Sequence, residues 1–227
     1  MAERRTAALL GGGAVLGGAV VMLVALVAAP GPWLQGYVSE AGTAGMQFAA
    51  PYRYGLVVLA CGVALIGLAV RPWSGLLTLL LSGSAVFAAT SGVVPCSNQC
   101  PLPPYEPTTV NDVVHTAASI AGLLILAGAM VLVAFSSSFR PATRRLSVVA
   151  AALLVPLGAA LGLTMLLIGR GPLGAVLERI ALLVAVSWLV GLSLLTLLRS
   201  SVKVKPWIRH QSLSNTGSPR SRSGSRS

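Results

Sequence analysis

Acidic side chains are scarce in this chain of 227 residues, where five Asp and Glu stand against sixteen Lys and Arg. Charged residues of both signs make up only 9% of the sequence, whereas about a quarter of a typical soluble domain is charged. A soluble globular protein is therefore excluded. Because lipid admits only helices or closed barrels across its core, the chain must be one of these two kinds of membrane protein.

Alternation of apolar and polar residues, which marks the strands of a membrane barrel, is also missing. Leu, Val, Ala and Gly instead form continuous runs of about twenty residues, the length that one helical crossing needs. We therefore predict an all-α polytopic bundle, a transmembrane domain of residues 1–199 with six helices. The expected helices cover residues 7–29, 54–70, 75–94, 113–135, 146–168 and 174–198.

Positive charge is unevenly divided between the two faces of this predicted domain. Thirteen of the sixteen Lys and Arg fall on the face that carries both termini, while four of the five acidic residues fall on the other. Since cytoplasmic loops are enriched in Lys and Arg, we expect both termini in the cytoplasm and a plasma-membrane location. The excess of Arg over Lys, and of Ala, Val, Leu and Gly over Ile, indicates a GC-rich bacterial genome.

The two ends of the chain each allow an interpretation of their own. Residues 200–227 are basic and serine-rich, which predicts a disordered tail attracted to anionic inner-leaflet lipids rather than to nucleic acid. Arg4 and Arg5 before an apolar run could instead mark a cleavable signal peptide. That run has 23 residues, longer than the roughly 7 to 15 of a signal core, so retention of the first helix is favoured.

Two glycine pairs have the spacing that lets helix backbones approach closely, Gly13 with Gly17 and Gly158 with Gly162. We expect them to form packing seams inside the bundle, with oligomerisation as the alternative. Only three cysteines are present, too few for a disulfide scaffold. Cys96 and Cys100 lie on the face expected to be oxidising, which predicts a disulfide, whereas Cys61 is expected to be a small buried hydrophobe.

Ionisable groups near the bilayer are costly and are functional candidates by default. The intramembrane ones gather on the face opposite the termini, where Asp112, His115 and Ser119 share one stripe of the fourth predicted helix because they are three and four residues apart. A ligand pocket on this face would be lined by Glu40, Arg53, Asp112, His115, Glu178 and Arg179.

Several of these residues also belong to short motifs. They are Ser39-Glu40-Ala41-Gly42 after the first helix, Pro95 with Asp112 and His115, and Glu178-Arg179-Ile180 with Trp188. In these motifs the chain resembles the bacterial domain-of-unknown-function family 998 over residues 7–199. The resemblance implies a six-helix membrane protein and no particular reaction, and the Cys96–Cys100 loop departs from the family pattern.

Three uses of the polar face remain open. One is a pocket for a lipid headgroup or small polar ligand. A second is an outer-leaflet lipid hydrolase in which Asp112 orients His115 as the base toward Ser119. The third is an accessory or assembly protein, in which the same residues only hold helix ends together.

Chemistry at this face has few other candidates. A zinc site using His115 with Asp112, Glu40 or Glu178 would contain a single histidine. We therefore expect no metal and no cofactor, and enzymatic activity is not favoured, since no Gly-rich oxyanion loop accompanies Ser119.

Overall fold

The computed structural model describes residues 2–29, 36–97, 99–101 and 105–201, and within these ranges it contains helices and no strand. Each of the six α-helices is long and apolar enough to cross a membrane, which confirms the predicted fold class. The elements are α1 (Ala2–Ala28), the 3-10 helix η1 (Val38–Gly42), α2 (Ala49–Val70), α3 (Gly75–Val93), α4 (Val110–Phe135), α5 (Pro141–Leu167) and α6 (Pro172–Ser201).

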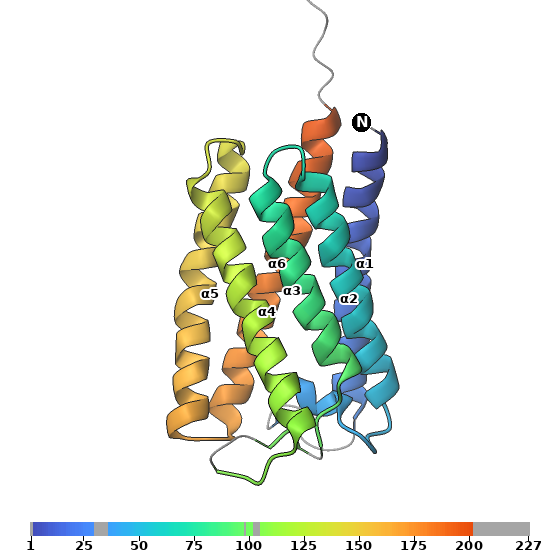
Figure 1. Cartoon of the computed structure of the whole chain (residues 1–227), viewed down its shortest axis with the longest axis vertical. Coiled ribbons are helices and arrows are strands. Elements are labelled where there is room, and N and C mark those ends of the chain that lie inside the picture. Colours follow the sequence, from blue (N-terminus) through green and yellow to red (C-terminus); the bar gives the residue numbers. More distant parts are fainter. Residues whose placement is uncertain (1, 30–35, 98, 102–104, 202–227) are drawn as a thin grey trace, which may run out of the picture.

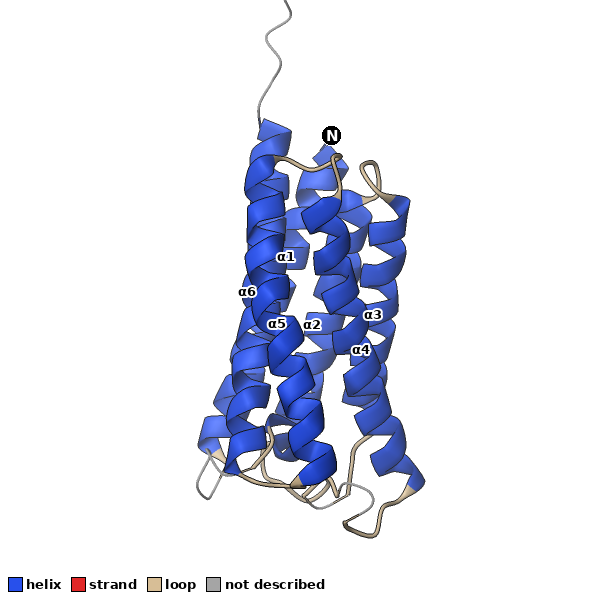
Figure 2. Cartoon of the chain, turned by 90° about the vertical axis from the view of Figure 1, so that its left-hand side faces the viewer, coloured by secondary structure: helices blue, strands red, loops and turns tan. Residues whose placement is uncertain are grey.

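The helices form an up-and-down bundle in which each packs against the next in the chain (Figure 1). Since α1 also packs against α6, the first and last helices close the arrangement, as the turned view shows (Figure 2). Trp188, Ile66 and Met130 lie in the core, each almost completely buried. The indole of Trp188 donates to the Ser147 hydroxyl, 2.8 Å away, so its single polar group is satisfied inside the bundle.

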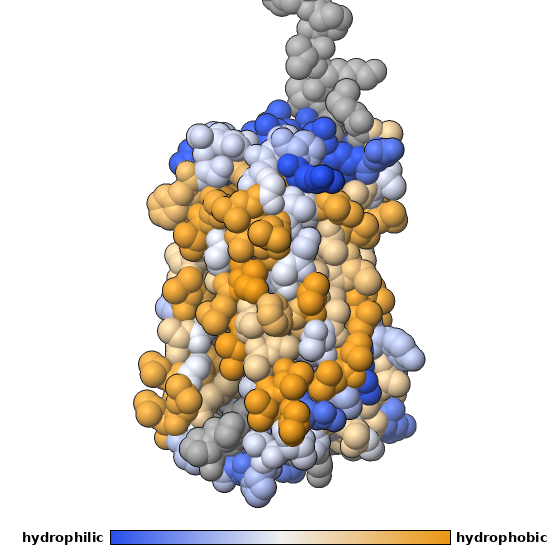
Figure 3. All heavy atoms as spheres, in the orientation of Figure 1, coloured by the Kyte–Doolittle hydropathy of each residue, from blue (hydrophilic) through white to orange (hydrophobic). Residues whose placement is uncertain are grey.

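Apolar side chains also cover the outside of the bundle. Leu79, Leu124 and Leu183 are each about two-thirds exposed, at 66 to 68%. The hydrophobic surface forms a band between two hydrophilic ends (Figure 3). Such a surface would promote aggregation in water, whereas lipid solvates it. This distribution indicates a lipid-facing exterior.

A glycine seam joins α1 to α2, and it differs from the one predicted. Gly11 lies against Gly62, and Gly18 against Gly55, so closely that a Cβ on Gly62 would lie 2.7 Å from the Gly11 carbonyl oxygen. The seven-residue spacing within each helix keeps both glycines on one face over two turns.

The predicted seams were wrong. A Cβ on Gly13, Gly17, Gly158 or Gly162 would meet nothing within 4 Å, so these glycines face away from the neighbouring helices. Cys61 is likewise exposed on the bundle surface rather than buried. In both cases sequence spacing shows that a position suits close packing, but it does not show which helix face points inward.

Most helices begin a few residues earlier than their apolar runs. α4 begins at Val110 instead of residue 113 because Thr109 caps it, and α5 begins at Pro141 instead of residue 146, with proline in its first turn.

α1 packs along α2 and α6, and the Ser193 hydroxyl donates to the Ala8 carbonyl at 2.7 Å. Of the tail predicted to be disordered, residues 200–227, the first two residues belong to α6 and those from 202 on lie outside the described residues.

Candidate functional site

Three connecting segments meet at the end of the bundle opposite the N-terminus (Figure 1). We define the polar end as η1, the segment after α3 (residues 94–101 without 98) and the turn between α5 and α6 (residues 168–171), with the adjoining helix ends. The predicted site residues all lie on these segments or in the N-terminal halves of α2, α4 and α6. They nevertheless form two groups with different partners.

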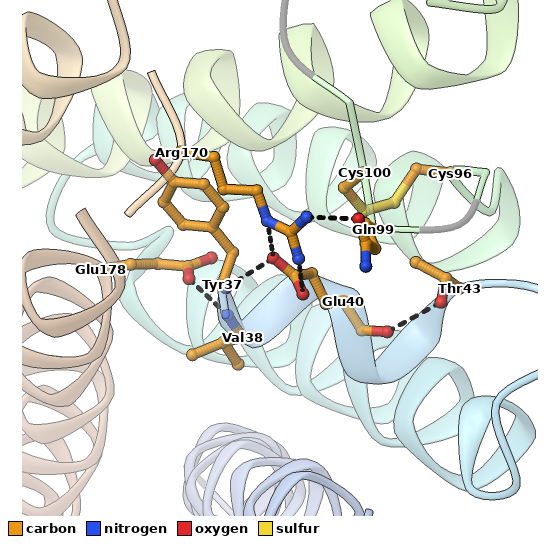
Figure 4. Close-up of polar contacts among 9 residues, drawn as sticks. All are labelled: Tyr37, Val38, Glu40, Thr43, Cys96, Gln99, Cys100, Arg170 and Glu178. Carbon is orange, nitrogen blue, oxygen red and sulfur yellow. Dashed lines mark hydrogen bonds and ion pairs between the residues drawn. A yellow bond between two sulfur atoms is a disulfide. The ribbon is translucent and has the colours of Figure 1, made fainter. Parts of the chain in front are cut away.

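An ion pair between Glu40 and Arg170 joins the first group (Figure 4). The guanidinium donates from Nε to Oε1 at 2.9 Å and from Nη2 to Oε2 at 2.6 Å, a bidentate arrangement. Its Nη1 donates to the side-chain oxygen of Gln99 at 2.7 Å. One arginine therefore ties η1, the loop of Cys96 and Cys100, and the α5–α6 turn together.

Sequence reasoning missed Arg170 and Gln99 as site residues. Glu40 and Arg170 are 130 residues apart, so no local spacing relates them. The only available signal was that Arg170 is one of three basic residues on the face that holds most of the acidic ones.

Glu178 and Tyr37 extend this group toward α6. The Glu178 carboxylate accepts a hydrogen bond from the Val38 backbone N–H at 2.5 Å, which fixes the start of η1 against α6. The Tyr37 ring packs on Leu161, where Gly174 leaves room for it: a Cβ there would lie 2.6 Å from the phenol oxygen. Burial, followed by the negative charges of Glu178 and Glu40, raises the pKa of Tyr37 to about 12, so the phenol stays neutral.

The two predicted arginines bind backbone carbonyls. Arg53 donates to the carbonyl oxygens of Gly92 at 2.9 Å and Val93 at 2.5 Å, which are acceptors left open at the end of α3. Arg179 donates to the Ala175 carbonyl of its own helix at 2.7 Å. Arg53 thus connects the start of α2 to the end of α3.

Asp112 belongs to the second group and is almost completely buried. It forms a capping box with Thr109, accepting from that residue's N–H and hydroxyl, each at 2.7 Å. It also accepts from the N–H of Ser97 at 2.6 Å and from its hydroxyl at 2.9 Å. The carboxylate therefore holds the loop after α3 against the start of α4.

His115 lies one turn further along α4, where it contacts α3. Its Nδ1 is 2.9 Å from the Val94 carbonyl oxygen, and the Ser91 hydroxyl is 3.3 Å from the same nitrogen. Ser119 donates to the His115 carbonyl at 3.0 Å and lies 2.8 Å from the Ser91 hydroxyl. These contacts differ from the Asp112–His115–Ser119 relay that the hydrolase hypothesis needs, in which the imidazole would bond both other side chains.

Cys96 and Cys100 lie at disulfide distance, as predicted, with their Cα atoms 5.1 Å apart. The loop between them turns tightly, since Gln99 and Cys100 have positive φ angles of 70° and 47°. Both sulfur atoms and a ring nitrogen of His115 lie within 4.8 Å of one another. The described metal-type ligands near His115 are therefore cysteines, whereas the zinc hypothesis paired it with carboxylates.

A family model described as "Protein of unknown function (DUF998)" matches residues 12–195. The chain belongs to this family. The predicted resemblance is thereby confirmed, and the description of the family assigns no reaction. No curated protein matches the chain, and no solved structure matches it.

Proposed function

We propose that this protein is an accessory or assembly component of the membrane, whose polar end is a fixed platform built from its own connecting segments. One observation carries the proposal: Arg170 binds Glu40 and Gln99 at once and so joins three segments that are far apart in the sequence. Such a platform provides a constant surface to another membrane component.

The other predicted ligand-binding groups support the same interpretation. Arg53 is bonded to two α3 carbonyls, and Asp112 accepts four hydrogen bonds from Ser97 and Thr109. A ligand would have to break these bonds before using the same atoms. Hydrogen bonds to charged groups are worth about 1.5 to 3 kcal/mol each, so the exchange would be costly.

In the orientation that we propose, the protein lies in a bacterial plasma membrane with both termini on the cytoplasmic side and the polar end on the outer side. Before the tail, seven arginines belong to the terminal face and three to the polar end. Reporter-enzyme fusions at residue 112 test this proposal. Activity of a periplasmic reporter at that position supports it, and activity of a cytoplasmic reporter there overturns it.

Alanine substitution tests the function itself. Separate Glu178→Ala and His115→Ala variants are compared with Glu3→Ala, an exposed carboxylate at the other end of the bundle. If the polar end is a platform, both variants lower the melting temperature and the folded yield, while lipid bound per folded chain, measured by native mass spectrometry, stays constant. Unchanged folding with loss of bound lipid would contradict the platform.

A second function, binding of a lipid headgroup or small polar ligand, is favoured by the Tyr37 hydroxyl. This group is buried and has no hydrogen-bond partner in the described part of the chain, a state that costs about 1 to 3 kcal/mol. A bound ligand could supply the partner. Tyr37→Phe then distinguishes the two functions, because it preserves or raises the melting temperature of an empty platform and abolishes co-purification of a ligand bound through the phenol.

A further inference from the structure

Two cysteines and a histidine form a compact cluster within the platform. Cys96 and Cys100 come from the loop after α3, and His115 from α4. All three are buried, and their ligand atoms lie within 4.8 Å of one another. Figure 4 shows the paired sulfurs next to Gln99, at the edge of the ion-pair network.

The donor set is chemically specific once the sulfurs are reduced. Two thiolates and one imidazole suit Zn²⁺, which binds such ligands tetrahedrally and leaves a fourth position for water in open sites. At a zinc–sulfur distance of about 2.3 Å, two tetrahedral sulfurs lie about 3.8 Å apart. The 5.1 Å between the two Cα atoms permits this separation through side-chain rotation alone.

A backbone hydrogen bond selects the tautomer of His115. Its Nδ1 lies 2.9 Å from the Val94 carbonyl oxygen, which can only accept, so a hydrogen bond there requires the proton on Nδ1. The lone pair then resides on Nε2. A backbone carbonyl that fixes the tautomer in this way is a usual outer partner of a metal-binding histidine.

The loop is also held independently of the sulfur–sulfur bond. Ser97, next to Cys96, is bonded to Asp112 through its N–H and its hydroxyl. Gln99, next to Cys100, is bonded to Arg170. Both cysteines therefore stay close to His115 when the disulfide is opened. This lowers the entropy cost of ordering the loop when a metal binds.

We propose that Cys96, Cys100 and His115 form a redox-controlled site for a thiophilic divalent cation such as Zn²⁺. A dithiol reductant supplies two electrons and two protons, becomes a disulfide itself and converts the Cys96–Cys100 bond into two thiols. Zn²⁺ then binds both sulfurs and the neutral imidazole, and the two thiol protons are released. Exchange with a disulfide oxidant, which takes up two electrons and two protons and becomes a dithiol, re-forms the Cys96–Cys100 bond, removes two ligands and releases the cation.

Zinc stoichiometry of the full chain in lipid nanodiscs tests the site. The disulfide is opened with a phosphine, which takes up the oxygen of one water as phosphine oxide, and the excess is removed. Reduced and oxidised protein are incubated with Zn²⁺, desalted and measured by elemental mass spectrometry. We expect about one zinc per reduced chain and none per oxidised chain. Equal zinc in the two forms would overturn the proposal.

Variants identify the ligands. Cys61→Ser, which removes the exposed third cysteine, is the matched control and keeps full binding. The Cys96→Ser/Cys100→Ser double variant binds none, and His115→Gln weakens binding at least about tenfold. Co²⁺ gives an independent readout, since thiolate ligation adds a sulfur-to-metal absorption band. Undiminished zinc in the double variant, or unchanged zinc affinity in His115→Gln, would refute the assignment of these ligands. If a variant folds poorly, the comparison of reduced with oxidised wild-type protein still tests the site.

Discussion

The two ends of the bundle both carry arginine, but they neutralise it differently. At the polar end, Arg170 is paired with a carboxylate of the same chain. At the other end, which we call the basic end, Arg4 and Arg199 lie over the ring of Trp73, with their guanidinium carbons 5.3 and 4.2 Å from its centre. Arg199 also donates to the Ser138 carbonyl at 3.1 Å.

Ring faces and carbonyls orient a guanidinium without cancelling its charge. The basic end therefore keeps a positive field that anionic lipid can neutralise, whereas the polar end neutralises itself. A hollow of about 460 Å³ lies at the basic end, between the end of α4 and the start of α5. Its lining combines two cations with apolar side chains: Ala134, Pro141, Arg144, Arg145, Val148 and Val149. The comparison indicates that one end serves cohesion and the other serves contact with the membrane surface.

The largest expected effect is at Asp112. Asp112→Asn replaces an acceptor of four hydrogen bonds with a group that also donates, so partly buried donors of Ser97 and Thr109 lose their partner. We expect the free energy of unfolding to fall by about 2 to 4 kcal/mol. Thermal and denaturant unfolding in detergent micelles measure it. Glu3→Gln at the basic end is the control, and equal stability of the two variants would break the comparison.

Arg53 gives the next largest effect. Arg53→Gln releases two carbonyls at the end of α3 and is expected to cost about 1 to 2 kcal/mol. Arg144→Gln removes one bond, to the Ala134 carbonyl at 3.1 Å, and should cost less than about 1 kcal/mol. Unfolding of both variants under the same conditions checks the order. If Arg144→Gln lost more unfolding free energy than Arg53→Gln, the cohesive role assigned to the polar end would be contradicted.

Lipid preference should change at the basic end alone. Arg144→Gln combined with Arg145→Gln removes two cations from the hollow, and each is expected to contribute about 1 kcal/mol of attraction to anionic lipid. Native mass spectrometry with phosphatidylglycerol and phosphatidylcholine measures the preference. Arg170→Gln should leave it unchanged. An equal loss of the preference for anionic lipid in Arg170→Gln would mean that the polar end also attracts anionic lipid.

The smallest expected effect belongs to Trp73. Trp73→Leu keeps an apolar side chain but removes the aromatic ring over which Arg4 and Arg199 lie. We expect a loss of about 0.5 to 1 kcal/mol in stability. Because the contact is electrostatic, added salt should reduce the difference between the variant and the wild type. A difference that does not depend on salt would point to packing instead.

The six helices could be predicted because each crossing needs a run of apolar residues of fixed length, and that run is visible in the sequence. The role of Asp112 in capping α4 was also predictable, since Thr109 stands three residues before it, although its bonds to Ser97 were not. Neither Arg170 nor Ser91 could be assigned, because their partners come from other segments. The sequence also could not show that Gly13 and Gly17 point away from the neighbouring helices. Their spacing places them on one face of α1 but does not show whether that face packs inward.

A double-mutant cycle between Glu40 and Arg170 tests most directly whether the polar end neutralises itself. Unfolding free energies are measured for the wild type, Glu40→Gln, Arg170→Gln and the double variant. The bidentate, partly buried pair should give a coupling energy of about 1 to 2 kcal/mol. Additive effects, with a coupling energy below about 0.3 kcal/mol, would show that the two residues act independently and would contradict the account.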